Sequence, residues 1–162
     1  MKETKLSPFA ESISSEELAY IAGIVDGEGT ITISKQSKHR GAFYPRISVA
    51  NTSKVLLDWL NERISGAVYV MGRNERWRTA WQLIWDKKKT IPLIEALLPY
   101  LVIKKPQAEV VLLLNKFNKE ALDKFSIKKF GSYIRPPDDL VKLREECYKD
   151  ILILNARGRK VS

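Results

Sequence analysis

Apolar residues recur along the chain with two different periods, which divide it into helices and strands. After Ser14 the apolar positions fall three and four residues apart up to residue 27, the spacing of one side of a helix. Ser14 and Glu17 have the spacing of a capping box, so this helix is expected to begin at Ser15. Alternation with period two follows over residues 30–34 and 44–51, and it predicts a hairpin of half-buried strands.

The same order then repeats. Helical spacing predicts helices over residues 52–64, 90–101, 107–122 and 135–155. Alternation predicts a second hairpin between the first two of these helices, with strands over residues 68–73 and 76–85. The helix over 90–101 is expected to have Thr90 as its cap and Pro92 in its first turn. The strand residues predicted to face inward are Ile31, Ile33, Ile47, Val49, Val68, Val70, Trp77, Trp81, Leu83 and Trp85.

The order αββαββα predicts an α+β fold. Four antiparallel strands would form a saddle-like sheet with helices on one face, followed by extra C-terminal helices. The expected organisation is a polar arm over 1–13, a single domain over 14–155 with its core in 15–118 and C-terminal helices in 119–155, and a basic tail over 156–162.

Composition narrows the class of partner. The chain has 162 residues, 44% of them hydrophobic, which is enough for one domain with a core. One cysteine, Cys147, excludes an internal disulfide and a thiolate zinc cluster, and one histidine, His39, argues against a histidine-based metal site or a Ser–His–Asp triad. A net charge of +9 favours a polyanion, either nucleic acid or an anionic membrane surface.

Membrane association is the weaker of these two interpretations. No apolar run approaches the roughly 20 residues that span a bilayer, and no amphipathic helix with a basic face stands out. The N-terminal residues contain no apolar stretch typical of a signal peptide, so we expect an intracellular protein, in a prokaryotic cytoplasm or an organelle, that is not secreted.

The outward face of the predicted sheet is rich in Arg, Gln, Ser and Thr and contains no acid. Arg can pair with guanine and Gln with adenine in the major groove, which admits a β-ribbon. A solvated face is the alternative, but such a face usually mixes charges of both signs. The residues predicted to contact DNA are Thr32, Ser34, Gln36, Lys38, Tyr44, Arg46, Ser48, Tyr69, Arg73, Arg76, Arg78 and Gln82.

The stretch "AYIAGIVDGEG" combines small residues with acids. On a helix Ala19, Gly23 and Gly27 fall on one side, which lets another helix approach closely and predicts an interface between two copies. Asp26 and Glu28 of both copies would then meet, and a divalent cation such as Mg²⁺ would offset their repulsion. A tight turn capped by Asp26 is the alternative. The predicted interface residues are Ala19, Ala22, Gly23 and Asp26.

A metal site beside a basic sheet, without histidine or thiol ligands, points to metal-assisted hydrolysis of phosphodiesters. The stretch "YIAGIVDGEGT" also resembles the signature of the LAGLIDADG homing endonucleases, and "ISVANTSKVLLDWL" and "LLPYLVIKKPQAEVVLLL" resemble later stretches of that family. The resemblance covers roughly residues 15–118, and the signature occurs once.

The resemblance implies a homodimer, because members with a single motif are homodimers that cut pseudo-palindromic double-stranded DNA. It also implies 3′ overhangs of four nucleotides and encoding within an intron or an intein, of which we expect an intron. Mg²⁺ or Mn²⁺ is the expected cofactor, and Ca²⁺ could occupy the site without supporting cleavage. Glu28 stands where the family places its metal-binding acid, usually Asp, and Gly27 would offer its carbonyl to the metal.

The resemblance implies two further catalytic residues. Asn51 matches the polar residue that holds the attacking water, and Lys104 matches the basic residue near the scissile phosphate. Lys105 competes with Lys104 for this role, and Lys54 is a candidate for a second basic group. Without the resemblance, Asn51 could instead cap the next helix, and Lys104 could be a solvated lysine.

A binding module without cleavage is the alternative function. Relatives with this fold act as RNA maturases or as DNA-binding regulators, in which the metal site is degenerate. The acid retained at Glu28 favours the nuclease.

Overall fold

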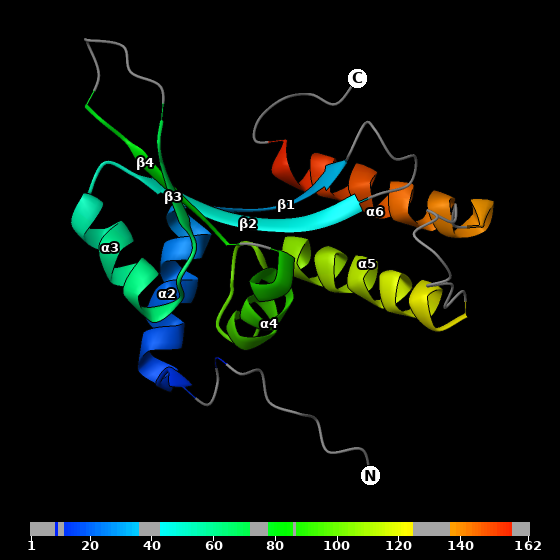
Figure 1. The fold of residues 1–162 in the computed structure, drawn as a ribbon, viewed down its shortest axis with the longest axis horizontal. Coiled ribbons are helices and arrows are strands. Elements are labelled where there is room, and N and C mark those ends of the chain that lie inside the picture. Colours follow the sequence, from blue (N-terminus) through cyan, green and yellow to red (C-terminus); the bar gives the residue numbers. More distant parts are fainter. Residues whose placement is uncertain are drawn as a thin grey trace, which may run out of the picture.

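The computed structural model describes Phe9 and residues 12–35, 43–71, 78–85, 87–124 and 137–156. Within these ranges the chain forms five helices and four strands in the predicted order (Figure 1). The helices are α2 (Ser15–Glu28), α3 (Lys54–Arg63), α4 (Lys87–Leu97), α5 (Lys105–Lys124) and α6 (Asp138–Asn155). The strands are β1 (Gly29–Lys35), β2 (Phe43–Asn51), β3 (Ala67–Val70) and β4 (Trp81–Trp85).

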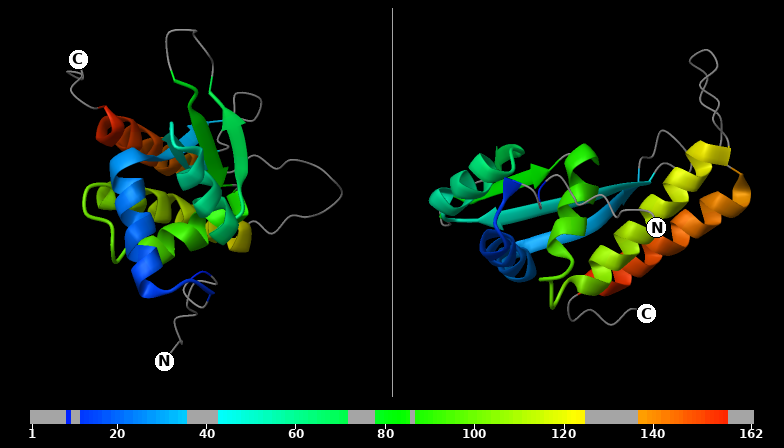
Figure 2. Two further views of the ribbon diagram at one scale, coloured as in Figure 1. Left: turned by 90° about the vertical axis from the view of Figure 1, so that its left-hand side faces the viewer. Right: turned by 90° about the horizontal axis from the view of Figure 1, so that it is seen from below.

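The four strands form one antiparallel sheet in the order β1-β2-β4-β3. Helices α2, α3 and α4 pack against its inner face, while α5 and α6 lie side by side and pack against β1 (Figures 1 and 2). The α+β class and the four-stranded antiparallel sheet are therefore confirmed. No helix of the described ranges is long and apolar enough to cross a membrane.

The core lies between the sheet and the helices that pack on it. Ile31, Ile33, Ile47 and Val49 are buried, as their alternation predicts. The capping box that begins α2 is also present: the Ser14 hydroxyl accepts the Glu17 N–H at 3.2 Å, and the Glu17 carboxylate accepts the Ser14 N–H at 3.4 Å.

The second hairpin differs from the sequence prediction. Val68 and Val70, predicted to face the core, are 38% and 58% exposed. Strand β3 is the outermost strand of the sheet, and helix α3 packs against β2 and β4 instead. Apolar and polar residues can thus alternate along an edge strand although no helix covers its apolar side, and the apolar side chains then stay exposed. Trp77 and the predicted turn at residues 74–75 lie outside the described residues.

Helix α4 begins earlier than predicted. It starts at Lys87, so Thr90 is not its cap and Pro92 lies beyond its first turn. Thr90 is buried, and its hydroxyl donates to the Trp85 carbonyl at 3.3 Å. The hydroxyl thus ties α4 to the end of β4 instead of capping the helix.

Helix α6 is held against the edge of the sheet. The Lys35 ammonium donates to the Glu145 carboxylate at 2.8 Å, and this hydrogen bond holds the pKa of Glu145 below its usual value. Cys147 is buried in the core, and burial raises the pKa of its thiol.

Candidate active site

Helix α2 passes directly into strand β1 at Gly29. The Gly29 N–H donates to the Val25 carbonyl and closes the helix. A Cβ atom at Gly29 would lie 2.6 Å from the Val25 carbonyl oxygen, so only glycine fits this junction. Because of this sharp passage, Glu28 stands between the end of a helix and the start of an edge strand.

Asp26 clamps this helix end to the loop that precedes α5. Its two carboxylate oxygens accept the N–H groups of Val102 and Lys104, each at 2.8 Å. The Lys104 ammonium donates in return to the Asp26 carbonyl. The last carbonyls of a helix have no partner within the helix and carry negative partial charge, so a buried ammonium stabilises this end.

Glu28 and Lys104 line the same hollow. Its volume is about 340 Å³, and the other lining residues are Gly27, Gly29, Thr30 and Asn155. Glu28 is exposed, whereas only 3% of Lys104 is exposed. Thr30 pairs with Ser48 in the register and lies on the outer face of the sheet. The hollow therefore borders that face.

The donors around the hollow suit a hard divalent cation. The lining residues include Gly27, Glu28, Thr30 and Asn155, which carry carbonyl, carboxylate, hydroxyl and amide oxygens of the kind that such cations bind. Mg²⁺ is usually bound through one or two carboxylates, with water and substrate phosphates completing its shell. Within the described residues no cluster of three or more His, Cys, Asp or Glu side chains is present. One chain thus offers a partial ligand set that a phosphate, water or a second chain would complete.

The other predicted site residues lie elsewhere. The Asn51 amide oxygen accepts the Ser53 N–H at 2.8 Å, just before α3, and Asn51 does not line the hollow. The Lys54 ammonium donates to both carboxylate oxygens of Asp58 at 2.7 Å. Lys105 is the exposed first residue of α5. The structure therefore brings together Gly27, Glu28 and Lys104, but not Asn51.

The outer face of the sheet is less exposed than predicted. Ser48 is buried at 6% exposure, because it lies in the middle of the sheet and accepts a hydrogen bond from the Gln82 amide at 3.3 Å. Tyr69 and Arg78 are exposed. The half-buried members are Thr32, Ser34, Tyr44, Arg46 and Gln82. Four predicted contacts, Gln36, Lys38, Arg73 and Arg76, lie outside the described residues, as does His39.

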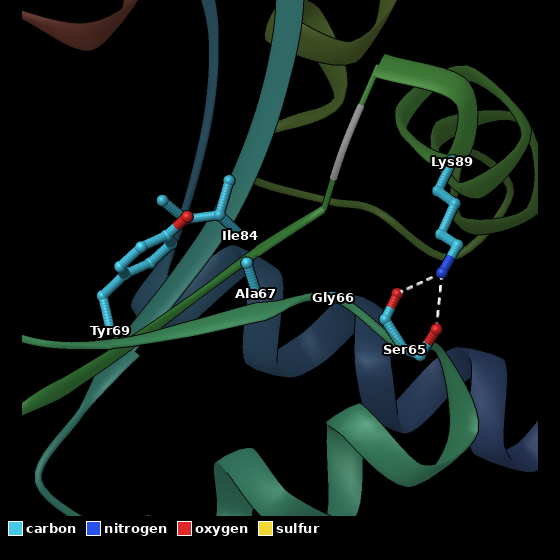
Figure 3. A pocket seen from close by; sticks show the side chains of 6 residues that line it. All are labelled: Ser65, Gly66, Ala67, Tyr69, Ile84 and Lys89. Atoms are coloured by element: carbon cyan, nitrogen blue, oxygen red, sulfur yellow. Dashed lines mark hydrogen bonds between the residues drawn. The ribbon is translucent and has the colours of Figure 1, made fainter.

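A second hollow, of about 350 Å³, lies where α3 turns into β3 (Figure 3). Tyr69, Ala67 and Ile84 line one side of it, and Lys89 of α4 reaches the turn from the other side. The Lys89 ammonium donates to the carbonyl and hydroxyl oxygens of Ser65 at 2.5 Å each. No acid is among its lining residues, so this hollow lacks the metal-binding group found beside Lys104.

The predicted interface on α2 divides into two halves. Ala19 and Gly23 are exposed, and a Cβ atom at Gly23 or Gly27 would meet nothing within 4 Å. Ala22 and Asp26 are instead buried within the chain, so they do not belong to a surface for a second copy. They lie next to Ala19 and Gly23 on the helix, but toward the side that packs on the chain's own core.

Comparison of the chain with solved structures identifies its fold. The first comparison is with an archaeal intron-encoded homing endonuclease, I-Vdi141I, complexed with DNA: 16% identity, TM-score 0.66, covering 91% of this chain and 89% of that chain. The LAGLIDADG homing endonuclease I-GzeII in complex with its DNA target gives 17% identity and a TM-score of 0.54, covering 88% of this chain and 44% of that chain. The chain has the LAGLIDADG endonuclease fold.

A third structure agrees. The LAGLIDADG meganuclease I-CpaMI bound to uncleaved DNA has a TM-score of 0.53 at 19% identity, covering 85% of this chain and 49% of that chain. No protein-family model and no curated protein sequence matches the chain. The predicted family resemblance is thus confirmed through the LAGLIDADG fold.

Sequence reasoning missed Asn155. It is the last residue of α6, far from the signature in sequence, and it enters the hollow because α6 lies along β1. No motif or spacing links residue 155 to residue 28, so only the tertiary arrangement of the LAGLIDADG fold reveals it.

The clamp at Asp26 gives a first prediction. Asp26→Asn keeps the size of the side chain but leaves one oxygen for two N–H donors, so unfolding free energy should fall by about 1.5–3 kcal/mol. Urea denaturation measures this loss. Asp58→Asn is the control, since its exposed pair with Lys54 is worth about 0.5 kcal/mol or less. Equal losses in the two variants would show that the clamp does not stabilise the fold.

Proposed function

We propose that this chain is a site-specific homing endonuclease, which acts as a homodimer and hydrolyses both strands of a long pseudo-palindromic DNA site with divalent metal. The observation that carries the proposal is the hollow in which exposed Glu28 and buried Lys104 lie together beside the outer face of the sheet. Phosphodiester hydrolysis of this kind needs an acidic side chain that binds a metal ion and a positively charged side chain that stabilises charge on the phosphate.

The outer face supports DNA as the partner. Its described residues offer hydrogen-bonding groups from Thr, Ser, Tyr, Gln and Arg without a carboxylate, and the chain has a net charge of +9. Positive charge supplies the salt-dependent affinity for the phosphate backbone, whereas Arg and Gln can read base edges. The proteins with the same fold named above were solved with DNA.

The chemistry follows from the groups in the hollow. A divalent ion, when bound, lowers the pKa of water and offsets negative charge on the phosphate. In this proposal Lys104, which lines the same hollow as Glu28, stabilises the charge that develops on the phosphate oxygens. The water oxygen forms a bond to phosphorus as the bond from phosphorus to the leaving sugar oxygen breaks. Solvent takes the proton of the water and gives one to the leaving oxygen.

A second copy is the partner proposed for the exposed side of α2. Gly23 lowers the helix propensity by about 1 kcal/mol relative to Ala, yet nothing in the described part of the chain occupies the space above it. Val102 and Ile103, which the Asp26 clamp holds beside the end of α2, are 80% and 66% exposed. Helix-on-helix packing at Gly23, with these two residues at its end, would bury both features.

The lengths of similar proteins support pairing. I-GzeII and I-CpaMI, matched over most of this chain, are covered for 44% and 49% of their own length. Such chains have room for two units of this size, and the described part of this chain forms one such unit. By analogy with the family, we further propose 3′ overhangs of four nucleotides and encoding within an intron.

Glu28→Gln tests the cleavage proposal. A duplex is first selected from a random library for binding to the chain in Ca²⁺, and cleavage is then started with Mg²⁺. The variant should lose about 100- to 1,000-fold in single-turnover cleavage rate, the range for a group that stabilises transition-state charge. Its affinity for the duplex should be equal or higher, because a negative charge near phosphate is removed. Fluorescence anisotropy measures this affinity.

Glu62→Gln is the matched control for this experiment, because Glu62 is exposed on α3 and does not line the hollow. It should cleave like the wild type. Binding of DNA by the wild-type chain without any cleavage would favour a DNA-binding regulator. Binding of a structured RNA instead of the duplex would favour a maturase.

Val102→Glu tests the homodimer, with Val55→Glu on α3 as the control, since both valines are 80% exposed. Each copy would lose the burial of one valine, at least about 1.5 kcal/mol, so the dimer Kd should rise by about 100-fold or more. Sedimentation equilibrium without DNA measures Kd. A wild-type chain that stays monomeric on and off DNA, or equal Kd values for both variants, would overturn the interface.

A further inference from the structure

Asn155 brings helix α6 into the hollow that holds Glu28. It is the last residue of α6 and lines the hollow together with Glu28 and Lys104. The residue that resemblance assigns to the attacking water, Asn51, does not line it. The amide side chain that lines the hollow is therefore that of Asn155, whereas the prediction was Asn51.

The orientation of the Asn155 amide follows from its partner. Nδ2 donates to the Ile31 carbonyl oxygen at 2.9 Å. Because a carbonyl oxygen is an acceptor only, the atom that faces it must be the nitrogen, and the amide oxygen occupies the other branch. No donor from the described part of the chain is recorded on that oxygen, which leaves it as the acceptor that Asn155 offers to the hollow.

The end of α6 is held firmly enough to keep this amide in place. The Gln107 amide of α5 donates to the Leu154 carbonyl at 3.2 Å, one residue before Asn155. Ile151, one turn earlier, is fully buried in the core. The amide thus projects from a helix end fixed to both β1 and α5. Catalytic groups need such fixed supports, since a displacement of about 1 Å can lower a rate about 100-fold.

The Asn51 amide is used differently. Its oxygen accepts the Ser53 N–H at 2.8 Å, and Ser53 in turn caps α3 by accepting the Leu56 N–H. An oxygen already bonded to a backbone N–H in the turn before a helix is less available to orient water. This arrangement matches a structural role for Asn51.

We infer that Asn155, and not Asn51, supplies the amide oxygen that accepts a hydrogen bond from the attacking water. The inference rests on the proposed function. Asn155 then directs a lone pair of the water toward the phosphorus, while Lys104 and Glu28 keep the roles proposed above. It touches a reacting molecule and is in that sense a catalytic residue.

The test compares five proteins on the duplex selected with the wild-type chain: wild type, Asn155→Ala, Asn155→Asp, Asn51→Ala and Gln107→Ala. Asn155→Ala should cleave about 100-fold more slowly at saturating protein, with unchanged affinity for the duplex in Ca²⁺. Gln107→Ala releases the same helix end without touching the hollow. It should lower the thermal midpoint as much as Asn155→Ala does, but it keeps the amide itself, so its cleavage rate should fall much less than that of Asn155→Ala.

Asn155→Asp separates catalysis from anchoring. It loses the N–H to Ile31, as alanine does, but keeps an acceptor oxygen, so it should cleave faster than Asn155→Ala at a similar thermal midpoint. Equal rates in these two variants would show that only the anchor matters and would overturn the inference. So would cleavage that depends on Asn51 and not on Asn155. A wild-type chain that neither binds nor cleaves any duplex contradicts the proposed function itself, and the inference falls with it.

Discussion

The arrangement of the site depends on the bonds between Asp26 and the loop at residues 102–104. The Asp26 carboxylate accepts the N–H groups of Val102 and Lys104, and the Lys104 ammonium donates to the Asp26 carbonyl. These bonds join the end of α2 to the start of α5. They also help to fix Lys104 beside Glu28. The same bonds hold Val102 and Ile103 at the surface, so one buried acid organises both the hollow and the surface proposed for a second copy.

The two acids of "DGEG" therefore have different tasks. Asp26 is buried and is occupied by hydrogen bonds from the chain itself, whereas Glu28 is exposed at the edge of the sheet. Gly29 lets the chain turn at once from helix to strand, because any side chain there would clash with Val25. At Gly23, by contrast, a Cβ atom would meet nothing within 4 Å among the described residues, which is why we propose a second copy there.

Local patterns in the sequence predicted most of the fold. The capping box at Ser14, the alternation around Ile31 and Ile47 and the helical spacing each report interactions between neighbours along the chain, and the structure confirms them. Val68 and Val70 show the limit of this reasoning. Alternation indicates which side chains share a face, but it does not indicate whether a helix covers that face at the edge of a sheet.

The site was predictable as far as its residues lie in the stretches that resemble the family. Glu28, Gly27 and Lys104 do lie around one hollow, whereas Ala22 and Asp26 turned out to be inside the chain. Ser48 is buried because a neighbouring strand supplies Gln82, a pairing that the sequence of β2 alone does not contain. Asn155 reaches the hollow only through the packing of α6 on β1, which no local pattern encodes.

The central claim is that Glu28, at the end of a clamped helix, holds a divalent ion over a DNA phosphate in a complex of two chains. A crystal structure of the protein on its selected duplex, with anomalous data collected on bound Mn²⁺, tests it most directly. We expect two chains on one duplex, with Mn²⁺ bound by Glu28 of each chain and by an oxygen of the scissile phosphate. A single chain on the duplex, or Glu28 in solvent without ion or phosphate, would contradict the account.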